Sequence, residues 1–479
     1  MNATFFKPTL GLLDATMIVA GSMIGSGIFI VSADITRNTG SIGWLLMVWV
    51  ITGIMTLIAA LSYAELSAMF PKAGGQYVYL KEAYNPLVGF LYGWSFFSVI
   101  QTATIAAVGV AFAKFTAYIF PVFNEEIIVM DLGFITISSA QLLSIGVIVL
   151  LTFINSRGIK NGKFVQTTFT LAKLISLFGL IIFGLYAINI SVWDANWQDA
   201  WHLHHLSVDG KVTEYTWVLG AGAIAAAMVG SIFSSDSWNN VTFIASEVKN
   251  PKRNIGLSLF LGTLIVTVIY LFTNIAYTAV LSLQQIASAE NDRVGVVASQ
   301  AIFGNAGTII IALLIMVSTF GCNNGLILAG ARVYYTMSRD NLFFKKAGAL
   351  NKFSVPAWAL WLQCAFAAVW CLSGKYGELL DMISFVVVGF YMLTITGIFI
   401  LRKKRPEIVR PYKAFGYPVL PIIYIILGLS FCGLLVVFKP KFTWPGLLIT
   451  LIGIPIYYWV SSYNKKKGII TSPDEGTSE

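Results

Sequence analysis

Apolar segments long enough to cross a bilayer recur along the whole chain, separated by short polar connections. A helix of about 20 apolar residues spans the hydrocarbon core, so each segment predicts one transmembrane helix. The pattern predicts an all-α integral membrane protein with about twelve transmembrane helices and no separate soluble domain. The predicted spans lie near residues 15–31, 42–64, 87–115, 140–154, 164–188, 217–245, 256–282, 306–336, 356–373, 378–401, 418–437 and 445–463.

The first span is interrupted by Gly25, Ser26 and Gly27. Glycine costs about 1 kcal/mol relative to alanine inside a helix, and serine competes for backbone hydrogen bonds. Within a bilayer, non-helical backbone is tolerated only where it lines a protected cavity. The interruption predicts a broken helix at a buried polar site, while the spacing of Gly21 and Gly25 also fits a helix-packing motif.

Two ionisable side chains are expected deep in the membrane. Lys173 lies about nine residues, roughly 13 Å, into the fifth span, and Asp236 lies in the sixth. Burying such a charge costs at least about 2.5 kcal/mol, so each should face a cavity or a partner. Lys173 could also pair with a carboxylate or carbonyl in a purely structural role, and Asp236 could be a polar packing residue.

The short polar residues around Asp236, from Ser234 to Asn240, predict a second helix break. The sixth span runs opposite to the first in the predicted topology. Interruptions at corresponding places in the two halves of a chain are typical of transporters built from inverted repeats.

Basic residues are distributed unevenly across the predicted topology. With the N-terminus inside the cell, 23 of the 31 lysines and arginines lie on the inner side. This excess agrees with the positive-inside rule and predicts cytoplasmic N- and C-termini in the cell membrane. The topology also accounts for the net charge of +9, so a nucleic-acid partner is not required.

Cysteine and histidine give little indication of metal or disulfide chemistry. All four cysteines fall in apolar segments, which favours packing over a disulfide framework or a metal site. The three histidines cluster at 202–205 in the longest outer connection, residues 189–216, where exposure alone explains them. No cofactor is predicted, and a metal at these histidines is a minor alternative.

Five motifs in order, together with a C-terminal segment, resemble the amino acid–polyamine–organocation transporter superfamily. The segment 444–458 is similar to the L-type amino acid transporter branch. The resemblance covers nearly the whole chain. The motifs are MIGSGIF at 23–29, YAEL at 63–66, PKAGGQY at 71–77, SEVKNPKRNI at 246–255 and SRD at 338–340.

This resemblance implies the leucine-transporter fold, a five-plus-five inverted repeat with helices 1 and 6 unwound in mid-membrane. The expected single transporter domain covers residues 1–463. It divides into a first repeat at about 10–188, a second at about 217–401 and two further helices at about 418–463. Residues 464–479 are expected to form a cytoplasmic polar tail.

The resemblance also implies a substrate site at the two breaks. Gly25, Ser26 and Gly27 match the family's carboxylate-binding loop, which agrees with the positive end of the helix that begins there. Lys173 matches a lysine whose ammonium stands where sodium sits in sodium-coupled relatives. The candidate substrate-binding residues are Met23, Ile24, Gly25, Ser26, Gly27, Phe233, Ser234, Asp236 and Asn239.

Within that set, each group has its own implied role. Backbone carbonyls near Met23, Ile24 and Phe233 match the positions that receive the substrate ammonium. Phe233 also matches an aromatic gate, and Asn239 matches a polar contact of the L-type branch.

The chain departs from the L-type pattern in two places. Ser235, Asp236 and Ser237 replace small glycines, and this carboxylate could contact the substrate ammonium, accept a proton or select a cationic side chain. The eukaryotic L-type members are tethered through a cysteine in the outer loop after span three. Residues 116–139 hold no cysteine, so no disulfide-linked partner subunit is implied.

Together these features predict a sodium-independent transporter or exchanger of L-amino acids, foremost neutral ones, working by alternating access. A proton-coupled or cationic amino acid or polyamine permease is the alternative within this class. A membrane amino acid sensor is the alternative from another class. An enzyme is not predicted, because the chain has no His-rich cluster in its spans, no nucleophile elbow and no phosphate loop.

Overall fold

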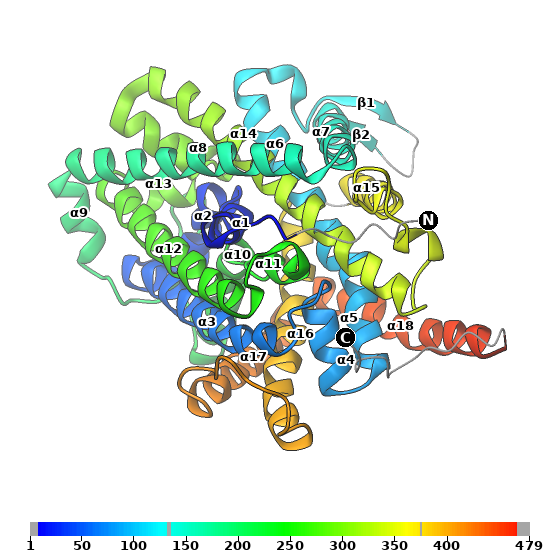
Figure 1. Ribbon diagram of the computed structural model, residues 1–479. Helices are drawn as coiled ribbons and strands as arrows, with labels where there is room; N and C mark the ends of the chain where they lie inside the picture. The colour runs from blue at the N-terminus through cyan, green and yellow to red at the C-terminus, as the bar shows by residue number, and fades with distance from the viewer. Residues whose placement is uncertain (1–7, 132–135, 374–375, 467–479) are drawn as a thin grey trace.

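The computed structural model describes residues 8–131, 136–373 and 376–466, and these are almost entirely helical (Figure 1). The first span is a pair of helices, α1 (Leu12–Met23) and α2 (Gly27–Thr39), which meet at 42°. The other long helices are α3 (Ile42–Met69), α5 (Pro86–Ser95) continued by the π-helical turn η1 (Phe96–Ile100) and α6 (Gln101–Ile119), α7 (Ser139–Ser156), α8 (Ile159–Tyr186), α10 (Trp217–Ser234), α12 (Pro251–Val280), α14 (Val294–Arg339), α15 (Ala357–Ser373), α16 (Tyr376–Lys404), α17 (Val419–Phe438) and α18 (Pro440–Lys466).

Short elements fill the connections between the long helices. Two small antiparallel hairpins, β1–β2 and β3–β4, depart from the all-α expectation, and both lie between spans. The short helices and strands are α4 (Gln76–Ala83), η2 (Pro121–Phe123), β1 (Ile128–Asp131), β2 (Thr136–Ser138), α9 (Ile190–Trp197), β3 (His204–Leu206), β4 (Val212–Glu214), α11 (Asn240–Phe243), η3 (Ala245–Glu247), α13 (Leu283–Ala287), η4 (Glu290–Asp292) and η5 (Lys345–Gly348).

The helices agree with the predicted spans, apart from differences of extent; the first span, for example, runs to Thr39 instead of 31. Among the described residues, ten helices are long and apolar enough to cross a membrane, and the bent α1–α2 pair adds an eleventh. The span predicted at 356–373 is α15, an apolar helix just below that length. The sixth span ends at Ser234 instead of 245, and the eighth begins at Val294 with a kink at Gly304. The predicted tail lies outside the described residues from 467 onward.

Local sequence signals account for several helix ends. Ser138 and Gln141 form a reciprocal capping box at the start of α7, and Thr216 caps α10. Pro251 starts α12, where the missing amide hydrogen costs nothing. Gly40 ends α2 with a φ of 65°, a left-handed conformation that glycine adopts without strain.

The two halves of the broken first span occupy the middle of the molecule, enclosed by longer helices (Figure 1). Glycines allow the helices to approach closely. A Cβ atom at Gly262 of α12 would overlap Val19 of α1, and one at Gly230 of α10 would press on Val31 of α2. Such close helix contacts replace the hydrophobic effect as a source of stability inside a bilayer. The broken helix is thereby held against neighbours that can contact its exposed backbone.

Candidate functional site

The first break leaves residues 24–26 outside regular helix, between Met23 and Gly27. Side chains of three other helices contact the carbonyl groups that this break frees. Lys173 of α8 donates to the carbonyl oxygens of Gly21 and Ile24, at 2.7 and 2.5 Å. The predicted break is therefore present, and the carbonyls at the end of α1 have polar partners within the protein.

Lys173 is completely buried, and its ammonium group faces backbone oxygen atoms. Helix carboxyl ends carry partial negative charge, so a cation placed there is stabilised without a carboxylate. The sequence allowed a carboxylate or a carbonyl as a structural partner for Lys173, and the structure shows carbonyls. These contacts connect α8 to the end of α1. The two carbonyl oxygens surround the ammonium group as they would surround a bound cation.

The second break follows Ser234, the last residue of α10, and separates it from the single turn α11. Residues 235–239 are not helical, and Ser237 has a φ of 66°, a strained value for a residue other than glycine. Such strain typically marks functional sites, because the surrounding structure must stabilise it. The prediction of an interruption around Asp236 agrees with this geometry.

The two breaks lie against one another. A Cβ atom on Gly27 would overlap the Ser234 side chain, so only glycine fits at the start of α2. The Tyr270 hydroxyl of α12 lies 3.0 Å from both the Met23 and the Ser234 carbonyl oxygens, and its hydrogen can serve either. Phe233 is buried beside them in the last turn of α10.

The small residues of the first break meet α14. Gly25 lies close to the Cys322 side chain, whose thiol donates to the Ser22 carbonyl. Ser318 of the same helix lies 3.4 Å from the carbonyl oxygens of Ile24 and Gly25. Ser26 is buried, so the start of α2 is enclosed by protein. The first amides of a helix have no partner within it and form a natural site for an anion.

Asp236 is buried on the far side of the second break and contacts Tyr391 of α16. The Tyr391 hydroxyl donates to its carboxylate at 2.5 Å. The Tyr391 ring also packs against Trp238 and Tyr63. Asp236 and Tyr391 line both of two small cavities. Among the described residues no ion pair joins Asp236 to Lys173: the lysine contacts carbonyl groups of the first break, and the carboxylate contacts Tyr391.

Asn239 extends one of these cavities toward the connection between the second and third spans. Its amide donates to Gln76 of α4 at 3.1 Å, and Gln76 donates to Thr394 of α16. Of the predicted residues, Met23, Gly27, Phe233 and Ser234 thus gather at the touching breaks. Asp236 and Asn239 line a neighbouring polar space.

Sequence reasoning missed three side chains: Tyr270, Gln76 and Tyr391. Tyr270 offered the clearest signal, because a hydroxyl in the middle of an apolar span needs an acceptor where water is absent. Gln76 lies within the PKAGGQY motif that contributed to the family resemblance.

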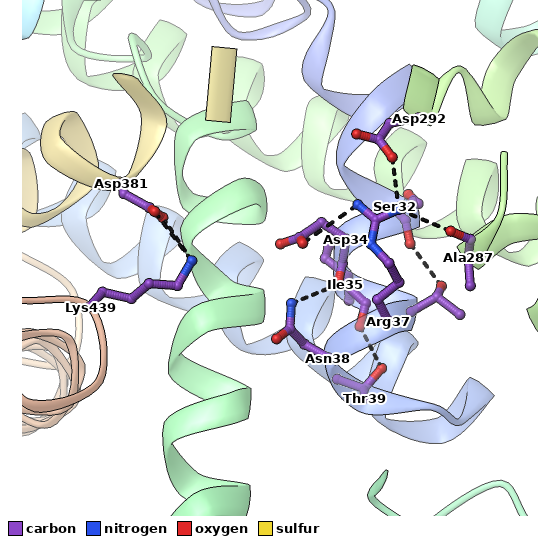
Figure 2. A network of polar contacts seen from close by, with 11 residues as sticks. Ser32, Asp34, Ile35, Arg37, Asn38, Thr39, Ala287, Asp292, Asp381 and Lys439 are labelled. Atoms are coloured by element: carbon purple, nitrogen blue, oxygen red, sulfur yellow. Dashed lines mark hydrogen bonds and ion pairs between the residues drawn. The ribbon is translucent and has the colours of Figure 1, made fainter. Parts of the chain in front are cut away.

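On one side of the breaks, the end of α2 is held by Arg37 (Figure 2). Its guanidinium donates to the Asp292 carboxylate at 2.7 Å and to the Ala287 carbonyl at 2.9 Å, and contacts Asp34 at 3.6 Å. α2 is thereby joined to the connection between α12 and α14. Asp381 and Lys439 form a separate pair nearby, 3.2 Å apart.

The opposite side is closed by a buried ion pair and by backbone contacts. Arg332 of α14 lies 3.1 Å from Glu247 in η3, and both side chains are almost fully buried. The chain before α1 adds to this closure, because the amides of Thr9 and Leu10 donate to the Glu247 carbonyl. The candidate site is therefore enclosed from both directions.

The histidines at 202–205 form a different arrangement. His202 pairs with Glu214 across the β3–β4 hairpin at 2.9 Å. Burial against the end of α2 lowers the pKa of the His204 imidazole. Within the described ranges, no group of three or more His, Cys, Asp or Glu side chains is arranged to hold a metal ion.

Comparison with known proteins finds similarity along nearly the whole chain. A family model described as an amino acid permease matches residues 10–461. The serine/threonine exchanger SteT of Bacillus subtilis (strain 168) is 31% identical over 455 residues, covering 94% of this chain and 96% of the relative. The b(0,+)-type amino acid transporter 1 of Mus musculus is 29% identical over 475 residues, 97% and 90% of the two chains. The large neutral amino acids transporter small subunit 2 of the same species is 28% identical over 496 residues, 98% and 88%.

Proposed function

This chain belongs to the amino acid permease family, and from that premise we propose that it exchanges L-amino acids, foremost neutral ones, without sodium. The family and the relatives are multi-span membrane transporters, and the apolar helices agree with that class. The names of the relatives support neutral substrates and exchange, since they include a serine/threonine exchanger and a large neutral amino acid transporter. We place the chain in the cell membrane with both termini in the cytoplasm, as its basic residues favour.

In this proposal the substrate's backbone binds between the two breaks. Its carboxylate faces Gly25, Ser26 and Gly27, where the amino end of α2 carries partial positive charge. Its ammonium faces carbonyl oxygens near Met23, Ile24 and Phe233. The observation that carries the proposal is the contact between the breaks. Tyr270 joins the carboxyl ends of α1 and α10, and the Gly27–Ser234 approach sets the amino end of α2 beside the end of α10.

Side-chain selection falls to the surrounding helices: the third, sixth, eighth and tenth spans. Asn239 and Ser234 line the second break on the substrate side, and Phe233 acts as the gate. Lys173 takes the place of a sodium ion, which its contacts with the carbonyls of Gly21 and Ile24 support. A fixed cation at that position makes sodium coupling unnecessary.

We assign the alternating movement to two inverted repeats, residues 10–188 and 217–401, with 418–463 as additional helices. We propose that the closures at Arg37 on one side and Arg332 on the other open in turn during this cycle. The four cysteines have free thiols and lie within helices. We propose that transport proceeds without a disulfide-linked partner.

The decisive experiment is uptake into proteoliposomes. Labelled serine, alanine, leucine, arginine and putrescine are offered to empty and preloaded vesicles, with and without sodium or a pH gradient. We expect rapid uptake of neutral amino acids only into preloaded vesicles, with no effect of sodium. Uptake only with sodium would refute the role of Lys173, and binding without accumulation would identify a sensor.

A second candidate function is a proton-coupled or cationic amino acid or polyamine permease. It is favoured by Asp236, a buried carboxylate that lines two cavities and contacts a tyrosine. If Asp236 selects cations or carries protons, Asp236→Asn abolishes arginine and putrescine uptake or removes the pH dependence of uptake. Tyr391→Phe serves as the control, because it removes the hydrogen bond and keeps the charge. Unchanged substrate range and pH profile in Asp236→Asn would exclude this alternative.

A further inference from the structure

A groove of about 720 Å³ lies away from the candidate site, between α3, the start of α12 and the segment 411–415 that follows α16. Leu61 of α3 lines it, together with Leu257 and Phe260 of α12. These side chains are only partly buried. The floor of the groove is therefore apolar and accessible from outside the helix bundle.

Its rim carries three basic side chains, Lys252, Arg253 and Lys413, and none of its lining residues is acidic. All three are exposed, and among the described residues none of them forms an ion pair with a carboxylate. Basic side chains around an apolar floor are complementary to an occupant that is itself both anionic and apolar.

A buried acidic group holds one wall of the groove. Glu65 of α3 is buried and accepts two hydrogen bonds from Arg402 at 3.0 and 2.7 Å. It also accepts the amide hydrogen of Ala414 at 2.6 Å. Glu65 thus fastens the 411–415 segment to α3, which fixes one wall of the groove. It leaves the charge of the rim unbalanced.

The groove follows the first turns of α12. Lys252 and Arg253 lie in the first turn of α12, and Leu257 and Phe260 follow one and two turns later. In a spanning helix, basic residues at the end lie among lipid headgroups and the next turns lie in hydrocarbon. Along α12, the basic residues and then the apolar residues therefore follow in the same order as the headgroup and the acyl chains of a phospholipid.

We propose that this groove binds one anionic phospholipid from the leaflet that faces the basic loops. Its phosphate contacts Lys252, Arg253 and Lys413, and one acyl chain lies along Leu257 and Phe260. Basic pockets between transmembrane helices bind acidic headgroups in this way, at about 1 kcal/mol for each basic residue. The bound lipid joins α12 to the segment that Glu65 holds, so it stabilises the packing of α3, α12 and α16.

The test is native mass spectrometry of the full-length protein, titrated in detergent with dioleoyl phosphatidylglycerol, dioleoyl phosphatidylcholine or glycerol 3-phosphate. We expect one tightly retained phosphatidylglycerol and no comparable retention of the other two. The variant K252Q/R253Q/K413Q should bind this lipid at least roughly tenfold more weakly. Equal retention of the two phospholipids would overturn the proposal, and retention of glycerol 3-phosphate would show an anion site without a role for the acyl chains.

A charge-matched control separates the groove from general attraction. The variant K345Q/K346Q/K352Q removes three exposed basic residues from another part of the same side, and it should bind phosphatidylglycerol like the wild type. A second variant, Leu257→Trp, keeps the charges and fills the apolar floor, and it should weaken retention as well. Equal losses in both triple variants, or full binding by Leu257→Trp, would refute a site in this groove. These outcomes do not depend on which amino acid is transported.

Discussion

Tyr270 connects the two helix breaks through one atom, which makes it the most informative side chain at the residue scale. Its hydroxyl serves the carbonyls of Met23 and Ser234, which have few alternatives in an apolar interior. Tyr270→Phe should lower the free energy of unfolding by about 1 kcal/mol and slow amino acid exchange, because the two breaks lose their common partner. Thermal unfolding in detergent and exchange in proteoliposomes measure the two effects.

Tyr277→Phe is the matched control for Tyr270→Phe. Tyr277 lies on the same helix, and within the described part of the chain its hydroxyl forms one hydrogen bond, to the Ile28 carbonyl of α2 at 3.3 Å. We expect a similar loss of stability with a normal exchange rate. Equal exchange rates in the two variants would mean that Tyr270 has only a structural role.

Lys173 gives a second prediction at this scale. Lys173→Ala removes two hydrogen bonds to the end of α1 that a charged donor forms. If these contacts change during the cycle, losing them should slow transport about tenfold, since 1.4 kcal/mol changes a rate by that factor. Expression should remain largely intact, as judged by a single peak in size-exclusion chromatography. A normal transport rate would leave Lys173 as a purely structural connection between α8 and α1.

At the scale of elements, hydropathy predicted the spans well because lipid imposes length and composition on each helix. The break at Gly25–Gly27 and the one at Asp236 were predictable for a similar reason. Polar or flexible residues inside a span are unfavourable in lipid, so they indicate a protected cavity or a polar partner. The extension of α14 back to Val294 was not predictable from hydropathy. Its first turns, up to the kink at Gly304, lie outside the apolar run that marked the span.

The side-chain partners of the breaks were beyond sequence reasoning for a different reason. Helices that are apolar on every side give no sign of which face points inward. Tyr270 contacts Met23 across 247 positions of the chain, and Tyr391 contacts Asp236 across 155. Only the packing of α12 and α16 against the broken spans brings these groups together.

α2 provides the prediction at this scale. Arg37→Gln removes its link to Asp292 and Ala287, which closes the outer side (Figure 2). A partly exposed ion pair contributes up to about 1 kcal/mol, so opening should become up to about fivefold more frequent. Hydrogen–deuterium exchange should therefore rise in residues 286–293 and at the end of α2. Lys439→Gln breaks the neighbouring pair with Asp381 and keeps the bonds from Arg37 to Asp292 and Ala287, so it should leave exchange there unchanged. A rise in both variants would indicate general loosening.

At the scale of the whole molecule, the distribution of basic residues predicts the orientation. In the predicted topology, the Glu247–Arg332 pair and the basic loops lie on the inner side, and Arg37 and the β3–β4 hairpin lie on the outer side. That topology assigns 23 of the 31 basic residues to the inner side. Because basic loops remain in the cytoplasm, the hairpin should face the exterior.

Cysteine labelling in cells tests this orientation directly. A membrane-impermeant maleimide should label Asp209→Cys in the hairpin of intact cells, and should label Lys346→Cys only after permeabilisation. The background is low, because Cys322, Cys364 and Cys371 are buried and Cys432 is half-buried within α17. The reverse labelling pattern would place both termini outside and exchange the roles of the two closures. It would also move the lipid groove to the outer leaflet, where anionic lipids are scarcer and its basic rim has fewer acidic headgroups to bind.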